Sequence, residues 1–338
     1  MINLLITIVA ILAVLAIVQI VRIVELSAQI SGEKDETETI KKDGNMNAIF
    51  MMVFLVGELF FMIYQTFRYK KFILPEPASL QGVITDRMLY IIFALIIFVF
   101  FVTQILLFFY TYKYKFNKGR RSFFFPDSHK LEFIWTAIPT VVLFGIIIYG
   151  LNVWNEITAP APADAKVIEV YAKQFDWTVR YSGKDNTLGK AGFRLVSDEN
   201  ILGVDKNDKN SADDIITKEL HMPVNTPILL KFRAQDVIHS VYLPHFRVQM
   251  NTVPGMPTHF FFNPTITTRE MRIKTNNPKF DYILLCNKVC GVAHYMMKMK
   301  VVVESNADYN IYLKSQKTLS ADAPTISSSS ATKVLATK

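Results

Sequence analysis

Cysteine and charge are both scarce in this chain. Only two cysteines occur, and Asp, Glu, Lys and Arg together make up 20% of the 338 residues, against 51% for hydrophobic residues. A composition this apolar argues against a purely soluble enzyme. The formal net charge is +8. However, no cluster of lysine and arginine lies on an aromatic or helical recognition element, which argues against nucleic acid as a partner.

Four long apolar stretches are the clearest feature that is present. They cover residues 2–21, 48–64, 89–112 and 133–154. Each is close to the roughly 20 apolar residues that cross a bilayer as a helix, so we predict about four transmembrane helices. The first stretch has neither a positively charged start nor a clear cleavage site, and we interpret it as a retained anchor.

Basic residues between the third and fourth stretches set the orientation. This loop holds the densest positive charge of the chain, in Lys113, Lys115, Lys118, Arg120, Arg121 and Lys130. The positive-inside rule places such a loop in the cytoplasm. The fourth stretch then runs outward, and the C-terminal half lies on the outer side of the membrane.

Short runs of Val, Ile, Phe and Tyr replace the long apolar stretches between residues 166 and 304. Examples are residues 167–171, 228–232, 259–262 and 299–303. Such runs are typical of strands, and the turn residues between them predict an all-β sandwich or barrel. The polar stretch at 185–217 is interpreted as a surface insertion.

The two cysteines share a loop with further soft ligands. Cys286, Cys290, His294 and Met297 follow one another at intervals of four, four and three residues. Thiolate, imidazole and thioether groups select copper or zinc over magnesium and calcium, and methionine beside histidine and cysteine is typical of copper electron-transfer sites. A second thiolate in the loop can bridge two copper ions.

One more imidazole would have to come from a separate strand. His239 is the candidate, because a strand would end and a loop begin there, and His245 competes with it. Two other interpretations stay open on spacing alone. The cysteines could form a disulfide in an oxidising compartment, or they could join His239 and His294 in a structural zinc site. Met297 would then be an ordinary core residue.

Three sequence motifs resemble cytochrome c oxidase subunit II. They are the Cys-x3-Cys-Gly-x2-His-x2-Met loop, the Asp-Val-x-His-Ser motif at 236–240, and the segment at 131–139, which is similar to the opening of the family's second helix. The resemblance covers roughly residues 89–304. It implies a cupredoxin-like domain on the periplasmic side of a bacterial inner membrane, in a form with two helices more than the family's usual two.

The resemblance also implies a dinuclear copper A centre. The bridging thiolates would be Cys286 and Cys290, and the other ligands would be His239, His294, Met297 and the backbone carbonyl of Lys288. At the last position the family often has a glutamate, whose side chain also reaches a magnesium ion at the boundary with subunit I. A lysine side chain cannot bind magnesium, which puts that ion in doubt here.

Three more residues match family positions that have a role. Phe175 and Trp177 match an aromatic patch that passes electrons from cytochrome c to the copper centre, although Phe175 stands where tryptophan is common, and a core strand residue is an equal alternative. Glu132 matches a residue at the mouth of a proton-uptake channel, but the helix dipole alone also favours an acidic residue there. Glu58, inside the second apolar stretch, matches no family position, and an intramembrane carboxylate is a functional hypothesis by default.

These features predict an electron-transfer subunit of an oxygen-reducing respiratory oxidase. The expected partners are subunit I with its haems and copper B, the other oxidase subunits, membrane lipid, and cytochrome c or a cytochrome-bearing respiratory complex. The chain itself would hold no catalytic residue. The alternatives are a copper A subunit of a nitric oxide reductase and a non-catalytic, disulfide-stabilised membrane surface protein.

The chain is expected to consist of four segments. We expect two additional transmembrane helices at 1–66, a transmembrane hairpin of the subunit II type at 67–158, an external copper domain at 159–310 and a tail at 311–338. The bias of the tail toward Ser, Thr and Ala predicts disorder.

Overall fold

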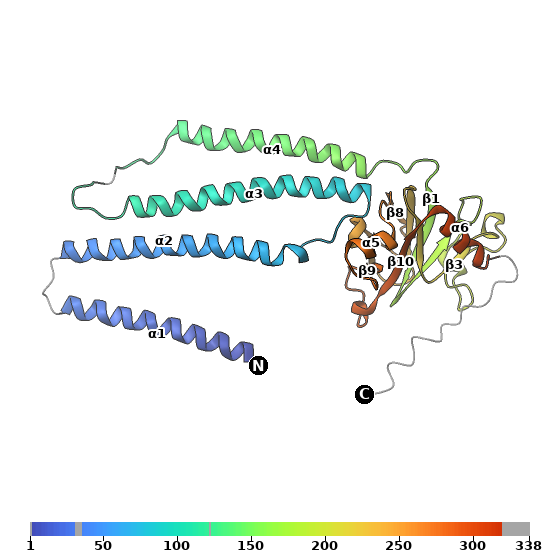
Figure 1. Cartoon of the computed structure of the whole chain (residues 1–338), viewed down its shortest axis with the longest axis horizontal. Helices are drawn as coiled ribbons and strands as arrows, with labels where there is room; N and C mark the ends of the chain where they lie inside the picture. Colours follow the sequence, from blue (N-terminus) through green and yellow to red (C-terminus); the bar gives the residue numbers. More distant parts are fainter. Residues whose placement is uncertain (1, 31–35, 122, 320–338) are drawn as a thin grey trace. The chain divides into compact units, whose positions relative to one another are not determined.

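The computed structural model of the chain describes residues 2–30, 36–121 and 123–319. In this part of the chain, four long helices precede a β domain (Figure 1). The helices are α1 Ile2–Ile30, α2 Glu36–Tyr69, α3 Leu80–Lys113 and α4 His129–Ile157. All four are long and apolar enough to cross a membrane, which confirms the predicted spans. Each helix is longer than its apolar stretch, because helical hydrogen bonding continues into the flanking polar residues.

Contacts divide the chain into two compact units. The first consists of residues 1–70 and 94–132, and the second consists of residues 71–93 and 133–338. In the first unit, α2 and the C-terminal part of α3 touch through Phe54 and Phe108, whose ring centroids lie 5.8 Å apart. The second unit contains the start of α3, most of α4 and the β domain.

The β domain is a sandwich of two five-stranded sheets, which confirms the predicted fold class. The sheet orders are β3-β2-β1-β5-β8 and β4-β10-β9-β6-β7. The strands are β1 Lys166–Lys173, β2 Asp176–Tyr181, β3 Ile215–Thr217, β4 Leu220–Pro223, β5 Ile228–Ala234, β6 His239–Leu243, β7 Val248–Thr252, β8 Thr258–Phe262, β9 Tyr282–Cys286 and β10 Lys298–Glu304. The pairs β1 with β5 and β4 with β10 are parallel.

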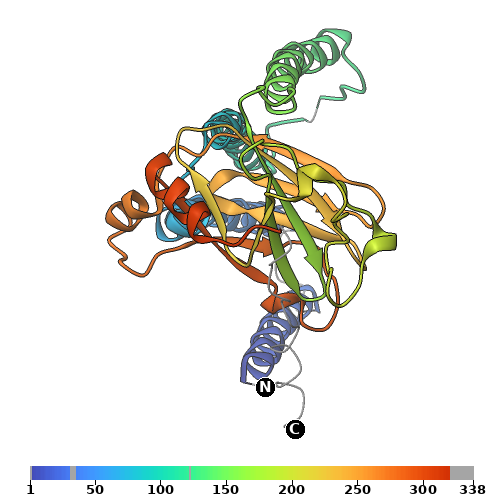
Figure 2. The same cartoon turned by 90° about the vertical axis from the view of Figure 1, so that its right-hand side faces the viewer.

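Apolar side chains fill the space between the sheets, because strand residues alternate between the two faces of a sheet. In β10, Met299, Val301 and Val303 are buried, and the residues between them are partly or fully exposed. Trp177 of β2 belongs to the same apolar cluster. Helix α5 Thr268–Lys274 contacts β10, and helix α6 Asn306–Ser315 contacts β4. The two helices lie on the same flank of the domain (Figure 2).

Helix α6 corrects the expected start of a disordered tail at residue 311. Ser305 caps this helix by accepting a hydrogen bond from the Asp308 amide, and Tyr309 is buried in the core cluster. The helix continues past the predicted boundary through Ile311, Tyr312 and Leu313, and the buried Tyr309 anchors it. Residues 320–338 of the predicted tail lie outside the described residues.

A buried charge cluster ties the polar stretch at 185–217 to the first sheet. Arg180 donates to Glu169 at 2.7 Å and to Asp214 at 3.2 Å, and all three side chains are at most 4% exposed. Arg233 also pairs with Glu169 and donates to the Leu202 carbonyl. The stretch predicted as a surface insertion is therefore held from the inside by ion pairs.

Arg180→Met should destabilise the β domain strongly, because it leaves two buried carboxylates with less compensation. We expect the free energy of unfolding to fall by about 3–5 kcal/mol, the usual cost of removing one partner of a buried pair. Lys218→Met breaks an exposed pair with Asp176 and should cost about 1 kcal/mol or less. Chemical denaturation of the full-length protein in detergent, followed by near-ultraviolet circular dichroism, measures both changes. Equal losses would contradict this ranking.

Stability should also depend on pH through Asp214. Burial raises the pKa of Asp214 to about 7, although the charge of Arg180 acts to lower it. The ordinary value is about 4, so the folded protein holds this proton more tightly than the unfolded chain does. The resulting stabilisation is complete below pH about 4 and is lost as the pH rises through about 7. We expect the free energy of unfolding to fall over this window in the wild type and to fall less in Asp214→Asn; parallel curves would refute the assignment.

Candidate metal centre

His239 is the first residue of β6 and follows a four-residue loop after β5. The strand boundary predicted there is thus the start of a strand and not its end. Its side chain is fully buried, and Nε2 lies 2.9 Å from Oδ1 of Asp236. This contact leaves Nδ1 free for another partner. Burial acts to raise the pKa of Asp236, but hydrogen bonds from His239 and from two backbone amides keep that pKa below its usual value.

Cys290 lies in the loop that joins β9 to β10, and Cys286 directly precedes this loop. Cys286 ends β9, and its amide donates to the Met297 carbonyl at 3.1 Å. The Asn287 amide donates at 2.9 Å to a carbonyl of β6, which ties the loop to that strand. Gly291 has a φ of +140°, and a Cβ there would lie 2.8 Å from the Phe175 ring. A side chain at this position would therefore push the loop away from the β1–β2 turn.

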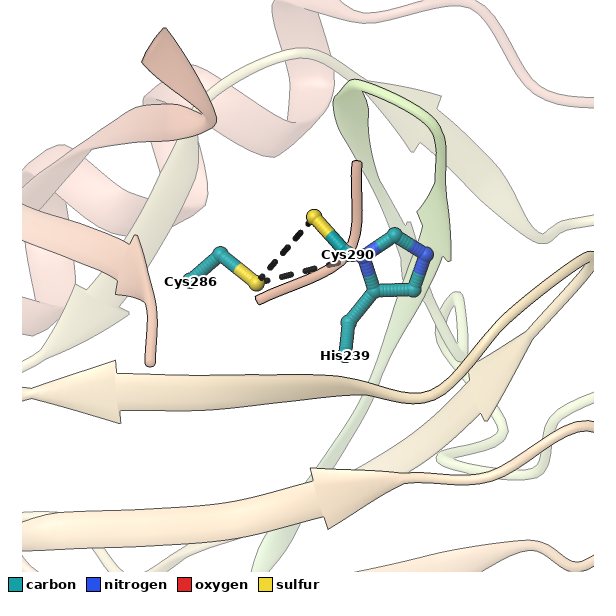
Figure 3. Close-up of side chains that lie close together, drawn as sticks. All are labelled: His239, Cys286 and Cys290. Atoms are coloured by element: carbon teal, nitrogen blue, oxygen red, sulfur yellow. Dashed lines mark hydrogen bonds between the residues drawn. The ribbon is translucent and has the colours of Figure 1, made fainter. Parts of the chain in front are cut away.

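Sulfur and nitrogen atoms of the predicted ligands gather at this loop (Figure 3). The Sγ atom of Cys286 lies 3.8 Å from the Sγ of Cys290 and 3.9 Å from Nδ1 of His239. Both cysteines are free thiols, so no disulfide joins them here. All three ligand atoms lie within 4.8 Å of one another, and among the described residues this is the one group of three or more His, Cys, Asp or Glu that is so compact.

Each thiol has its own further neighbours. The Sγ of Cys286 lies 3.2 Å from the carbonyl oxygen of Lys288, in addition to its contact with an imidazole. The Sγ of Cys290 lies 3.5 Å from Nδ1 of His294 and 3.7 Å from Sδ of Met297. The structure thus brings together all six residues named as ligands, with the two imidazoles at different thiols.

The competing candidate, His245, lies elsewhere. It belongs to the short helix η4 Pro244–Phe246, and its ring stands edge-on to Phe280 and Tyr282, with centroids 5.1 and 5.2 Å away. Burial and the charge of Arg247 lower the pKa of His245 to about 4. The ring is therefore neutral near pH 7 and packs as an aromatic residue.

Protonation of the thiols matters because the thiolate is the form that binds metal. Burial raises the pKa of the Cys290 thiol to about 11, and the neighbouring Cys286 adds to this effect. In the metal-free protein this thiol keeps its proton at neutral pH. A metal ion that binds here has to displace that proton.

The two aromatic residues named from the sequence have different surroundings. Trp177 is only 1% exposed; its Nε1 donates to the Met297 carbonyl at 3.4 Å, and its ring centroid lies 6.0 Å from that of His239. Phe175 is half-buried against Gly291. Of the two, Phe175 is the one that reaches the surface.

Asp236 and Gln174 are parts of the site to which the sequence alone assigned no role. Asp236 orients His239, and the Gln174 side chain donates to the carbonyl of Cys290. Both stand beside residues that were named. The signal that could have found Asp236 is a carboxylate three residues before a candidate metal-binding histidine. Metal-binding histidines usually have a hydrogen-bond partner on their second ring nitrogen.

Glu132 and Glu58 are not members of this group. Glu132 is in the first turn of α4, where its half-exposed carboxylate lies 3.4 Å from Nδ1 of His129. Glu58 in α2 has one buried carboxylate oxygen without a hydrogen-bond partner among the described residues. Their roles stay predictions.

Comparison with known proteins assigns both parts of the chain to one family. Residues 75–153 match the transmembrane domain of cytochrome c oxidase subunit II, and residues 166–306 match its periplasmic domain. An alternative cytochrome c oxidase subunit 2 from Bradyrhizobium diazoefficiens is 31% identical over 274 residues, which cover 80% of this chain and 92% of the relative. A cytochrome c oxidase subunit 2 from Thermostichus vulcanus is 25% identical over 281 residues, which cover 76% and 82%.

Solved structures include the periplasmic domain of subunit II of a cytochrome oxidase from Bradyrhizobium japonicum. It shares 23% identity with this chain at a TM-score of 0.31, and the match covers 46% of this chain and 95% of that chain. Helices α1 and α2 precede residue 75 and so lie outside the two family matches.

Four apolar helices and a periplasmic β domain make this chain a multi-pass membrane protein. The matches favour a subunit of a terminal oxidase complex over a nitric oxide reductase subunit or a non-catalytic surface protein. The fold, the loop that gathers two cysteines with soft ligands, and the matches along both domains show that the chain belongs to the cytochrome c oxidase subunit II family.

Proposed function

We propose that this subunit holds a dinuclear copper A centre and relays electrons from cytochrome c to the haems of subunit I. The arrangement of the two thiols carries the proposal. They lie 3.8 Å apart, and each has its own imidazole and its own weak ligand, a carbonyl oxygen beside Cys286 and a thioether beside Cys290. Soft ligands in this combination suit copper, and with two thiolates and two imidazoles they would hold two copper ions.

A structural zinc site fits the same residues less well. Zinc prefers four ligands around one tetrahedral centre. His239 and both sulfurs form a group whose ligand atoms all lie within 4.8 Å of one another, and His294 is not part of that group. Because the two imidazoles lie at different ends of the thiol pair, the arrangement favours two metal ions over one.

The chain's own residues hold the ligands in place. Bound copper would supply a reversible one-electron change shared between two ions. Asp236 fixes the ring orientation and the proton position of His239, which is the usual second-shell support of a metal ligand. Trp177 and Gln174 each donate a hydrogen bond to a carbonyl group of the ligand loop. Ligands fixed in this way need little rearrangement when the charge of the site changes.

Phe175 supports electron transfer into the site from the β1–β2 turn. Its ring touches Gly291, the residue next to Cys290, whereas the buried Trp177 contacts the ligands from inside the domain. We infer that cytochrome c, or a cytochrome-bearing complex, approaches the domain at Phe175. Trp177 would then lie along the path to the copper ligands.

Glu132 is the proposed contribution of this chain to proton uptake. Its carboxylate is half-exposed in the first turn of α4, at the end of the helix that the positive-inside rule places in the cytoplasm. An exposed carboxylate at that end can collect protons for subunit I.

Copper binding should depend on His239 and not on His245. We expect His239→Gln to lose at least half of the bound copper and the absorption of the dinuclear site, because one imidazole is removed. His245→Gln should keep both, since that ring packs against Phe280 and Tyr282. Metal analysis and visible absorption of the purified full-length subunit measure the outcome. Similar copper contents in the two variants, or zinc alone in the wild type, would rule out the proposed site.

Electron transfer from cytochrome c should depend on the Phe175 ring. Phe175→Leu is expected to slow reduction of the site several-fold while leaving its absorption unchanged, because no ligand is altered. Phe193→Leu, at an exposed aromatic residue of the polar insertion, is the control and should have no effect. Stopped-flow mixing of the assembled oxidase with reduced cytochrome c gives both rates. An unchanged rate in Phe175→Leu would make this residue a packing residue only.

A further inference from the structure

The segment that leads into α3 is built into the β domain. The Ala78 amide donates to the His245 carbonyl at 2.6 Å, and the Ser79 hydroxyl donates to the Phe246 carbonyl at 2.7 Å. Both acceptors belong to η4, which joins β6 to β7. Ala78 and Ser79 are fully buried. Helix α3 therefore starts from a fixed point of the β domain.

Arg247 forms a buried ion pair with Asp86 at the same place. Its Nε and Nη2 atoms donate to the two carboxylate oxygens of Asp86, each at 2.8 Å. Nη2 also donates to the Pro75 carbonyl at 2.6 Å, and Nη1 donates to the Pro244 carbonyl. One guanidinium group thus joins the second turn of α3, the linker before this helix, and η4. The side chains of Arg247 and Asp86 are both 8% exposed.

This pair supplies orientation more than stability. A guanidinium group that binds a carboxylate through two parallel hydrogen bonds fixes both the distance and the angle between them. Arg247 also adopts a φ of +55°, a left-handed conformation that costs energy for any residue with a Cβ. Apolar side chains of similar volume are often at least as stabilising as a buried ion pair. Apolar side chains would not fix a single orientation of the first turns of α3 against η4.

Strand β6 connects the Asp86–Arg247 pair to the candidate metal centre. The strand begins at His239 and ends at Leu243, directly before η4. Its central residue Val241 pairs with Cys286 of β9. One short strand therefore separates the candidate ligands from the Asp86–Arg247 pair. A movement of η4 against the start of α3 would move these ligands as well.

We propose that Asp86 and Arg247 form a positioning pair that sets the place of the copper ligands relative to the start of helix α3. This inference rests on the proposed relay function. Electron transfer between two centres slows steeply as their separation grows, so the relay needs the ligand loop at a constant distance from the haem of subunit I. The pair acts through β6 and touches no electron carrier itself.

The test uses the complete oxidase with Asp86→Asn or Arg247→Lys in this subunit. Light-triggered injection of single electrons, followed at the copper and haem absorption bands, separates reduction of the copper site from its reoxidation by haem. We expect unchanged copper absorption, an unchanged rate of copper reduction and a several-fold slower transfer to haem in both variants. Asp86→Glu keeps a carboxylate and should recover part of the rate.

Glu76→Gln is the matched control, because Glu76 joins the same segment to Lys274 of α5 through a half-exposed ion pair. This variant should keep the wild-type rate of transfer to haem. A wild-type rate of transfer in Asp86→Asn and Arg247→Lys would overturn the positioning role. The role would also be overturned if both variants failed to assemble into the oxidase and Asp86→Glu assembled no better. A wild-type subunit without bound copper would instead overturn the proposed relay function.

Discussion

The candidate metal centre depends on the register of three neighbouring strands. β6 pairs with β9 so that Val241 faces Cys286, and β9 pairs with β10 so that Leu285 faces Lys298. These pairings bring His239 beside the loop that carries the other ligands. A shift of one residue would turn every side chain of a strand to the opposite face of its sheet. Backbone hydrogen bonding therefore determines which ligand atoms meet, before any metal binds.

Carboxylate and guanidinium side chains make hydrogen bonds where a loop, the polar insertion or a helix meets the sheets of the β domain. Asp236 contacts His239 beside the ligand loop. The ion pairs of Arg180 with two carboxylates lie at the polar insertion, and the ion pair of Arg247 with Asp86 lies at the start of α3. Buried ion pairs add little stability beyond what apolar packing would supply. They do fix distances and angles, because each hydrogen bond has a direction. The apolar core supplies most of the stability, and the charged contacts orient the attached parts.

Features that reside in short segments were predictable from the sequence. Apolar stretches, strand runs and the ligand spacing from Cys286 to Met297 each depend on a few neighbouring residues. Contacts between distant residues were not predictable: Asp86 and Arg247 are 161 positions apart, and no local pattern relates them. The choice of His239 over His245 came from the motif around it, since strand position alone left both open. Helix α6 was missed because its anchor, Tyr309 in the core, depends on contacts with residues far away in the sequence.

The main chain and the side chain of Lys288 have different surroundings. Its carbonyl oxygen lies 3.2 Å from the Cys286 sulfur, while its side chain is exposed. The position of a carbonyl depends on the course of the loop, which Gly291 and the hydrogen bond to β6 determine, and not on the residue type. A substitution at Lys288 would therefore change the exposed side chain and its charge, and the carbonyl contact with Cys286 would stay the same. The carbonyl oxygen beside the Cys286 sulfur thus does not depend on the residue type at position 288.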